Sequence, residues 1–135
     1  ILATMLVREG VTPFYRSAEV AFVPNVKFDF LLYTKEKGPI VLSAKTSLRE
    51  RYKQADLEGQ AIKSVYRKAE SYLVTLDNKE SKAVSKKIAD GTVLGLDECI
   101  VVTDHKFNIL IEQLKNFSFI VPPNVPIIQS GHFVK

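Results

Sequence analysis

Residues 26–45 read VKFDFLLYTKEKGPIVLSAK, and this stretch decides the fold. Residues 26–34 and 40–45 have the composition and side-chain alternation of two β-strands. The segment KEKGP between them has the Gly-Pro pair of a short connection, so the strands should form a hairpin. Alternation also predicts the two faces of each strand. Phe28, Phe30 and Leu32 should oppose Lys27, Asp29, Leu31 and Tyr33, while Val41, Ser43 and Lys45 should oppose Ile40, Leu42 and Ala44.

The flanking sequence predicts helices and further strands. We expect helices over 1–9, 48–70, 79–90 and 104–116, strands over 18–23, 71–76, 98–103 and 117–121, a turn at 24–25, and an irregular Pro-rich tail from Pro122. Helices among strands predict an α/β fold with a mixed central sheet flanked by helices. A length of 135 residues suits one domain, residues 1–135.

Composition narrows the class of protein. Apolar residues make up 46% of the chain and charged residues 25%, as in an ordinary globular domain. No apolar run reaches the ~20 residues of a membrane span, so we expect no membrane partner. The single cysteine, Cys99, cannot form an intrachain disulfide, and we expect it to fill the core of a cytoplasmic protein. A net charge of +4 is compatible with a polyanionic partner.

Four residues form a candidate catalytic group. Asp29 and Lys45 should approach each other near the open end of the hairpin, and Ser43 shares the face of Lys45. Glu58 falls in the series 58, 62, 65, 69 that should face the sheet, where a carboxylate is costly unless a cation meets it. Asp29 and Glu58 offer the hard oxygen ligands that suit Mg²⁺, with Mn²⁺ as a substitute. Taken one at a time, the residues are more typical of ordinary polar positions at a strand end or helix rim, and the catalytic interpretation depends on all four together.

These residues resemble the PD-(D/E)xK nuclease superfamily. Within it they are similar to EcoRII-like type II restriction endonucleases, which cut at CCGG, CCNGG or CCWGG and whose second acid has moved to the following helix. Ser43-Ala-Lys45, twelve further residues and Glu58 match that arrangement, and the resemblance covers residues 26–61. It implies a restriction-endonuclease-like fold, with Asp29 as strand acid, Ser43 in the vacated acid position, Lys45 as catalytic lysine and Glu58 as migrated acid. Phe28 stands where the family name has proline.

The same resemblance implies a divalent-metal-dependent endonuclease that cleaves double-stranded DNA at a short GC-rich palindrome, as a homodimer. Arg49, Glu50 and Arg51 would read bases, because arginine can bind guanine O6 and N7 and glutamate can accept from cytosine N4. A solvated helix start is the other interpretation of this triplet. Lys53, Lys63 and Arg67 are candidate phosphate contacts or ordinary surface residues. Glu9 either assists the metal site or is a surface residue at a helix end.

Other functions fit the same residues. The chain could be a non-catalytic DNA-binding module in which Asp29 and Glu58 are structural ion-pair partners of Lys45. It could also be a structure-specific repair or recombination nuclease of the same fold. A basic RNA-binding domain is disfavoured, because few aromatic side chains are placed to stack bases on a sheet face.

Overall fold

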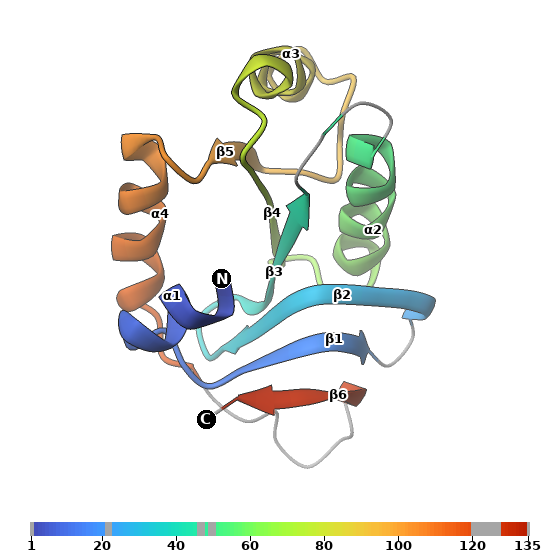
Figure 1. Ribbon diagram of the computed structural model, residues 1–135. Helices are drawn as coiled ribbons and strands as arrows, with labels where there is room; N and C mark the ends of the chain where they lie inside the picture. The colour runs from blue at the N-terminus through green and yellow to red at the C-terminus, as the bar shows by residue number, and fades with distance from the viewer. Residues whose placement is uncertain (1, 21–22, 46–47, 49–50, 120–127, 135) are drawn as a thin grey trace.

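A computed structural model describes residues 2–20, 23–45, 48, 51–119 and 128–134. Its centre is a six-stranded sheet with the order β5-β4-β3-β2-β1-β6, and four helices flank it (Figure 1). The elements in chain order are α1 (Leu2–Arg8), β1 (Phe14–Val20), β2 (Val23–Thr34), β3 (Gly38–Lys45), α2 (Arg51–Val65), β4 (Glu70–Thr75), α3 (Asn78–Ala89), β5 (Glu98–Val101), α4 (His105–Lys115) and β6 (Ile128–Val134).

The sheet is mixed. β3, β4 and β5 run parallel, and α2 and α3 make the two connections between them. β2 pairs antiparallel with both β1 and β3, and β6 pairs antiparallel with β1 at the edge. The α/β class and the mixed sheet flanked by helices are therefore confirmed. None of the helices in the described ranges is long and apolar enough to cross a membrane.

Helices cover both faces of the sheet (Figure 1). On one face, α1 and α4 pack against Phe30, Leu32 and Leu42. On the other face, α2 packs against Leu31 and Val41, and α3 contributes to a neighbouring cluster with β4 and β5. Both faces bury apolar side chains, which is why β3 and β4 carry nearly continuous apolar runs.

Several local predictions are confirmed. Residues 35–37 form the turn between β2 and β3, and Gly38 follows with a φ of +72° that favours glycine. Gly10, with a φ of +74°, follows the end of α1. Asp104 caps α4 by accepting a hydrogen bond from the Lys106 amide. The expected apolar stripe of α4 is buried, and its members are Phe107, Leu110, Ile111 and Leu114.

Other predictions about the elements are wrong. The turn expected at residues 24–25 lies inside β2, where proline is tolerated because the recorded ladder to β3 begins only at Phe30. β1 begins at Phe14 rather than at residue 18, and β5 ends at Val101 rather than at residue 103. α2 ends at Val65 rather than at residue 70. Part of the expected irregular tail forms β6, and of the strand expected over 117–121 the described part shows one isolated bridge, from Phe119 to Thr34.

Candidate active site

Asp29 lies where β2 separates from β3. The recorded pairing of the two strands ends at Phe30 and Leu42, so Asp29 and Ser43, and then Phe28 and Ala44, would be the next pairs in the same register. Instead, the Asp29 carboxylate accepts the Ala44 backbone N–H at 2.9 Å. The side chain therefore replaces a backbone acceptor at the strand end. This hydrogen bond directs the Asp29 carboxylate toward the last residues of β3.

The expected alternation of β2 breaks at the same place. Leu31 faces α2, and Phe30 and Leu32 face α1 and α4, as predicted. Phe28 is fully buried on the α2 face, opposite to the face predicted for it. Asp29 lines a cavity together with Phe30 and Ala44, which is also not the face that strict alternation gives. The irregularity turns the Asp29 side chain to the open end of the sheet. The side chain of Lys27 lies outside the described part.

The apolar residues of β3 alternate as predicted, because Val41 packs on the α2 face while Ile40 and Leu42 pack on the other. At the strand end, Lys45 lines the same cavity as its neighbour Ala44. Lys45 is half-buried at the last position of the strand. Ser43 is fully buried, and its hydroxyl has no hydrogen-bond partner among the described residues. A buried hydroxyl without a partner costs about 1–3 kcal/mol, so this position is not optimised for stability.

Glu58 reaches the same region from α2. The residues of α2 that bury completely are Ala55, Gly59 and Ile62, so Glu58 lies beside the stripe that faces the sheet rather than within it. Burial raises the pKa of Glu58, the nearby Lys45 ammonium lowers it, and the Asp29 carboxylate raises it further. The Gln54 side-chain amide donates a hydrogen bond to the Glu58 carboxylate at 3.2 Å. Asp29, Lys45 and Glu58 thus come from three elements and are close enough for their charges to interact.

Backbone contact fixes the position of α2. A Cβ atom at Gly59 would lie 2.1 Å from the Gly95 carbonyl oxygen, so only glycine permits this approach. The Gly95 amide also donates a hydrogen bond to the Asp56 carboxylate at 2.6 Å. These contacts join α2 to the loop before β5 next to Glu58. The height of Glu58 above the sheet is therefore set by backbone atoms rather than by adjustable side chains.

A cavity of about 430 Å³ opens beside the acid on β2. Asp29 and Lys45 line it, and so do Arg16 of β1 and Thr75 at the end of β4. The Arg16 guanidinium lies over the Phe30 ring, 5.7 Å from its centroid. The remaining lining is largely apolar and comprises Leu2, Met5, Phe30, Ala44, Val74, Leu76 and Val102. The cavity therefore combines an apolar floor with one acid and two cations at its rim.

The three charged groups do not close into a structural ion pair. Among the described residues, the ion pairs within 4 Å do not include Lys45 with either Asp29 or Glu58. No group of three or more His, Cys, Asp or Glu residues in the described ranges is arranged to hold a metal. What the described part offers is a pair of carboxylates, and Mg²⁺ is commonly held by one or two carboxylates while it keeps several waters.

Of the candidate base-reading triplet, the structure describes Arg51. Arg51 is the exposed first residue of α2, whereas Arg49 and Glu50 lie outside the described residues. Leu48 is fully buried, and its amide donates a hydrogen bond to the Asp77 carboxylate at 3.1 Å. Asp77 thereby holds Leu48, three residues before Arg51.

The candidate phosphate contacts are spread along α2. Lys53 is exposed in the first turn, near the end of β3. Lys63 forms an ion pair with Asp97 at 2.9 Å. Asp97 in turn accepts a hydrogen bond from the Ser71 amide at the start of β4. The start of β4 lies at the opposite end of the strands from Lys45. Arg67 is exposed in the turn between α2 and β4, at that same end of the strands. Only Lys53 of the three lies at the end of the sheet that holds Asp29 and Lys45.

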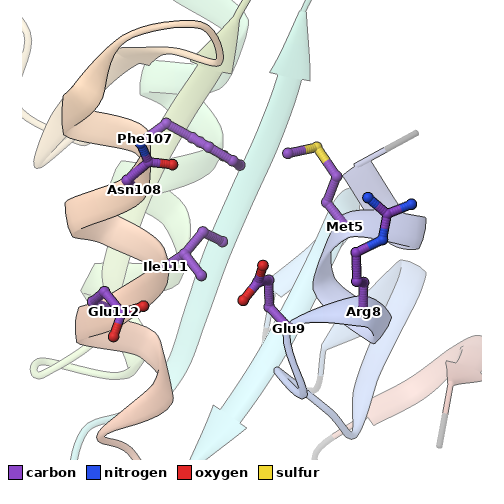
Figure 2. A pocket seen from close by; sticks show the side chains of 7 residues that line it. All are labelled: Met5, Arg8, Glu9, Phe107, Asn108, Ile111 and Glu112. Carbon is purple, nitrogen blue, oxygen red and sulfur yellow. The ribbon is translucent and has the colours of Figure 1, made fainter.

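Glu9 belongs to a different cavity, of about 210 Å³, between α1 and α4. Figure 2 shows Met5 and Phe107 pointing toward each other across it, with Glu9 directed at α4. Glu9 pairs with Lys115 at 2.8 Å, and this pairing lowers the pKa of the Glu9 carboxyl. It therefore acts as a helix-end surface residue that joins α1 to α4.

Sequence reasoning missed three residues of this region. Arg16, Gln54 and Asp77 lie outside the motif positions, and each acts through a tertiary contact. Arg16 has one local signal, its place two residues after Phe14 in an alternating strand. Cys99, in contrast, is buried as predicted, and its burial raises its pKa to about 11, as expected for a core thiol.

Comparison of the chain with protein-family models, with curated proteins and with solved structures finds no match. The functional proposal therefore depends on the geometry of Asp29, Lys45 and Glu58.

Proposed function

We propose that this protein is a divalent-metal-dependent endonuclease that hydrolyses phosphodiester bonds of double-stranded DNA. One observation carries the proposal: Asp29 of β2 and Lys45 of β3 line one cavity, and both lie near enough to Glu58 of α2 for their charges to act on its carboxyl. Convergence of two acids and a lysine from separate elements is the arrangement that the resemblance to PD-(D/E)xK nucleases implies. The sheet with an antiparallel β1–β3 meander and parallel β3 and β4 supports the restriction-endonuclease-like fold within this proposal.

The donor atoms fit Mg²⁺. Asp29 and Glu58 provide carboxylate oxygens, and Glu58 is half-buried without a closed ion pair to Lys45 in the described part. A buried carboxylate with a raised pKa is stabilised when a cation meets it. A bound Mg²⁺ supplies positive charge at the phosphate and makes water a better nucleophile.

The side chains around the two acids would act on the substrate. Lys45, at the end of β3, would place its ammonium group where negative charge builds on the phosphate oxygens. The Ala44 amide holds the Asp29 carboxylate and the Gln54 amide holds Glu58, so both acids are oriented before any substrate arrives. Such preorganisation is worth most when it costs no rearrangement during the reaction.

The substrate within this proposal is a short GC-rich palindrome. Arg51 opens α2 on the exposed side of the same end of the sheet, and the triplet with Arg49 and Glu50 would contact guanine and cytosine edges. A palindrome is read most simply by a two-fold symmetric pair of identical chains, so we propose a homodimer on DNA.

Plasmid cleavage tests the proposal. Purified protein should cut plasmid DNA into discrete bands with Mg²⁺ and leave it intact with a chelator. Lys45→Ala should abolish cutting while largely preserving DNA binding. Lys35→Ala is the matched control, because Lys35 is exposed in the turn at the opposite end of β3 and should have no effect.

Each other outcome has a definite meaning. A metal-dependent smear without bands would favour a structure-specific repair or recombination nuclease. DNA binding without cleavage in Mg²⁺ or Mn²⁺ would favour a non-catalytic DNA-binding module. Cutting by Lys45→Ala at the wild-type rate would refute the assigned role of Lys45.

A further inference from the structure

α3 carries most of the net charge of the chain. It contains four lysines and one glutamate, a net +3, while the whole chain has a net charge of +4. Lys87 is engaged with α2, because its ammonium donates to the Tyr52 hydroxyl at 2.9 Å and lies over the Tyr52 ring. The other three lysines, Lys79, Lys82 and Lys86, are exposed.

These three lysines form one stripe along α3. At about 100° per residue, positions 79, 82 and 86 fall within an arc of about 60°. The buried residues of the helix, Ser81 and Val84, lie on the opposite side. The lysine stripe, defined as Lys79, Lys82 and Lys86, therefore points away from the protein body and runs along about 10 Å of the helix axis.

The composition of the stripe is unfavourable for an isolated helix. Lys79 and Lys82 are three residues apart and Lys82 and Lys86 four, and like charges at these spacings destabilise a helix. Asp90 is the one acid at such a spacing from a stripe lysine, and its carboxylate accepts the Thr92 amide at 2.9 Å. Among the described residues, no ion pair within 4 Å includes a stripe lysine. A polyanion would relieve this repulsion.

α3 begins beside the candidate active site. Lys45 and Thr75 are paired at the ends of β3 and β4, and Thr75 and Leu76 line the cavity that contains Asp29. Asp77 caps α3 by accepting the Glu80 amide, and its second carboxylate oxygen accepts the Leu48 amide. One carboxylate thus joins the start of α3 to the segment after Lys45. In Figure 1, α3 lies at the end of the sheet toward which β3 points.

We infer that the lysine stripe of α3 binds the phosphate backbone of the duplex whose cleaved bond lies at Asp29 and Glu58. This inference rests on the proposed function and names the surface that holds the DNA beside the cleavage site. A length of about 10 Å matches about three phosphates at 3.4 Å of helix axis per phosphate of one strand. An anionic membrane is a weaker fit, because the apolar side of α3 is buried in the protein and has nothing to insert.

The salt dependence of DNA binding tests the inference. Binding of a mixed-sequence 30-base-pair duplex is measured by fluorescence anisotropy in EDTA, between about 50 and 200 mM salt. Lys79→Gln, Lys82→Gln and Lys86→Gln together remove three phosphate contacts, so the negative slope of log K against log salt should become shallower by about 2.7. Glutamine keeps the helix propensity of lysine and removes the repulsion within the stripe, so this variant should melt no lower than wild type.

A second triple variant is the matched control. Arg8→Gln, Lys35→Gln and Lys68→Gln together change the net charge by the same amount, and all three residues are exposed and lie outside α3. This control should keep the wild-type slope. Equal slopes for both triple variants, or a wild type that does not bind the duplex, would overturn the inference. Stripe-dependent binding to anionic phosphatidylserine vesicles that equals binding to the duplex would overturn it as well.

The failure of each proposal is separately visible. If the stripe controls the salt slope but wild type does not cleave with Mg²⁺, the nuclease proposal fails and the DNA-binding surface stands. If wild type cleaves but the stripe variant keeps the full slope, the surface is wrong and the nuclease proposal stands.

Discussion

Gly59 offers a sharp test of how the fold positions the site, because it adjoins Glu58 and contacts the Gly95 backbone. A methyl group at Gly59 would lie 2.1 Å from the Gly95 carbonyl oxygen and 2.7 Å from its carbonyl carbon. An ordinary contact needs at least 3.4 Å, so α2 and the loop must separate by roughly 1.3 Å. Both sides of the contact are backbone, which cannot rotate away as a side chain can.

The size of the effect of Gly59→Ala follows from three contributions. Overpacking costs about 1–3 kcal/mol, and strain on the hydrogen bond from Gly95 to Asp56 costs about 1 kcal/mol more. Alanine returns about 1 kcal/mol through helix propensity. The free energy of unfolding should fall by about 2 kcal/mol, and the melting temperature by about 7 °C. Displacement of Glu58 by about 1 Å should reduce metal-dependent cleavage by about 10²-fold.

Thermal unfolding and initial plasmid cleavage rates in Mg²⁺ measure both effects. Gln60→Ala, at the exposed next position of α2, is the control and should stay within about 0.5 kcal/mol of wild type and cut at the same rate. A Gly59→Ala protein that melts lower yet cuts at the wild-type rate would refute the positioning of Glu58 by this contact. An unchanged melting temperature would refute the close approach itself.

Three more predictions concern the charge, specificity and core of the protein. Burial raises the pKa of Glu58 above 4.5, so without metal the folded state loses stability as the pH rises through that raised pKa. Chemical denaturation in EDTA should therefore show Glu58→Gln to be more stable than wild type at pH 7 but not at pH 4, and identical pH profiles would contradict this. Arg51→Ala should lose its preference for particular cleavage sites before it loses non-specific DNA affinity, measured as band pattern and duplex binding, whereas an unchanged band pattern would exclude Arg51 as a base reader. Burial raises the pKa of Cys99 to about 11, so a thiol reagent at pH 8 should modify it only in denaturant, and fast labelling of the native protein would show that this part of the core is open.

Local signals in the sequence predicted the elements that depend on local chemistry. The cap at Asp104 and the apolar spacing of α4 were sufficient to place that helix, and alternation was sufficient for β3. The spacing of apolar residues predicted the wrong C-terminal end for α2. Ala69 continues the apolar period of the helix, but it is buried from the turn before β4. β6 was missed because its partner β1 is more than 100 residues away in the sequence and a Pro-rich segment precedes it.

The candidate site also contains residues that the sequence predicts and residues that only tertiary contacts reveal. The sequence placed Ser43 and Lys45 on one face through simple alternation, and it selected Asp29 and Glu58 through their spacing. It could not foresee that Asp29 captures the Ala44 amide, because that depends on where β2 leaves β3. Nor could it foresee Arg16, Gln54 or Asp77, because each meets the region only through tertiary packing.

The most direct test is a crystal structure of the protein soaked with Mn²⁺, with the ion located by its anomalous signal. We expect one strong peak in contact with carboxylate oxygens of both Asp29 and Glu58, with the Lys45 ammonium nearby. Loss of that peak in Glu58→Gln would show that it depends on the helix acid. A structure in which the two carboxylates point to opposite sides of the sheet, or in which the ion binds elsewhere, would contradict the proposed nuclease.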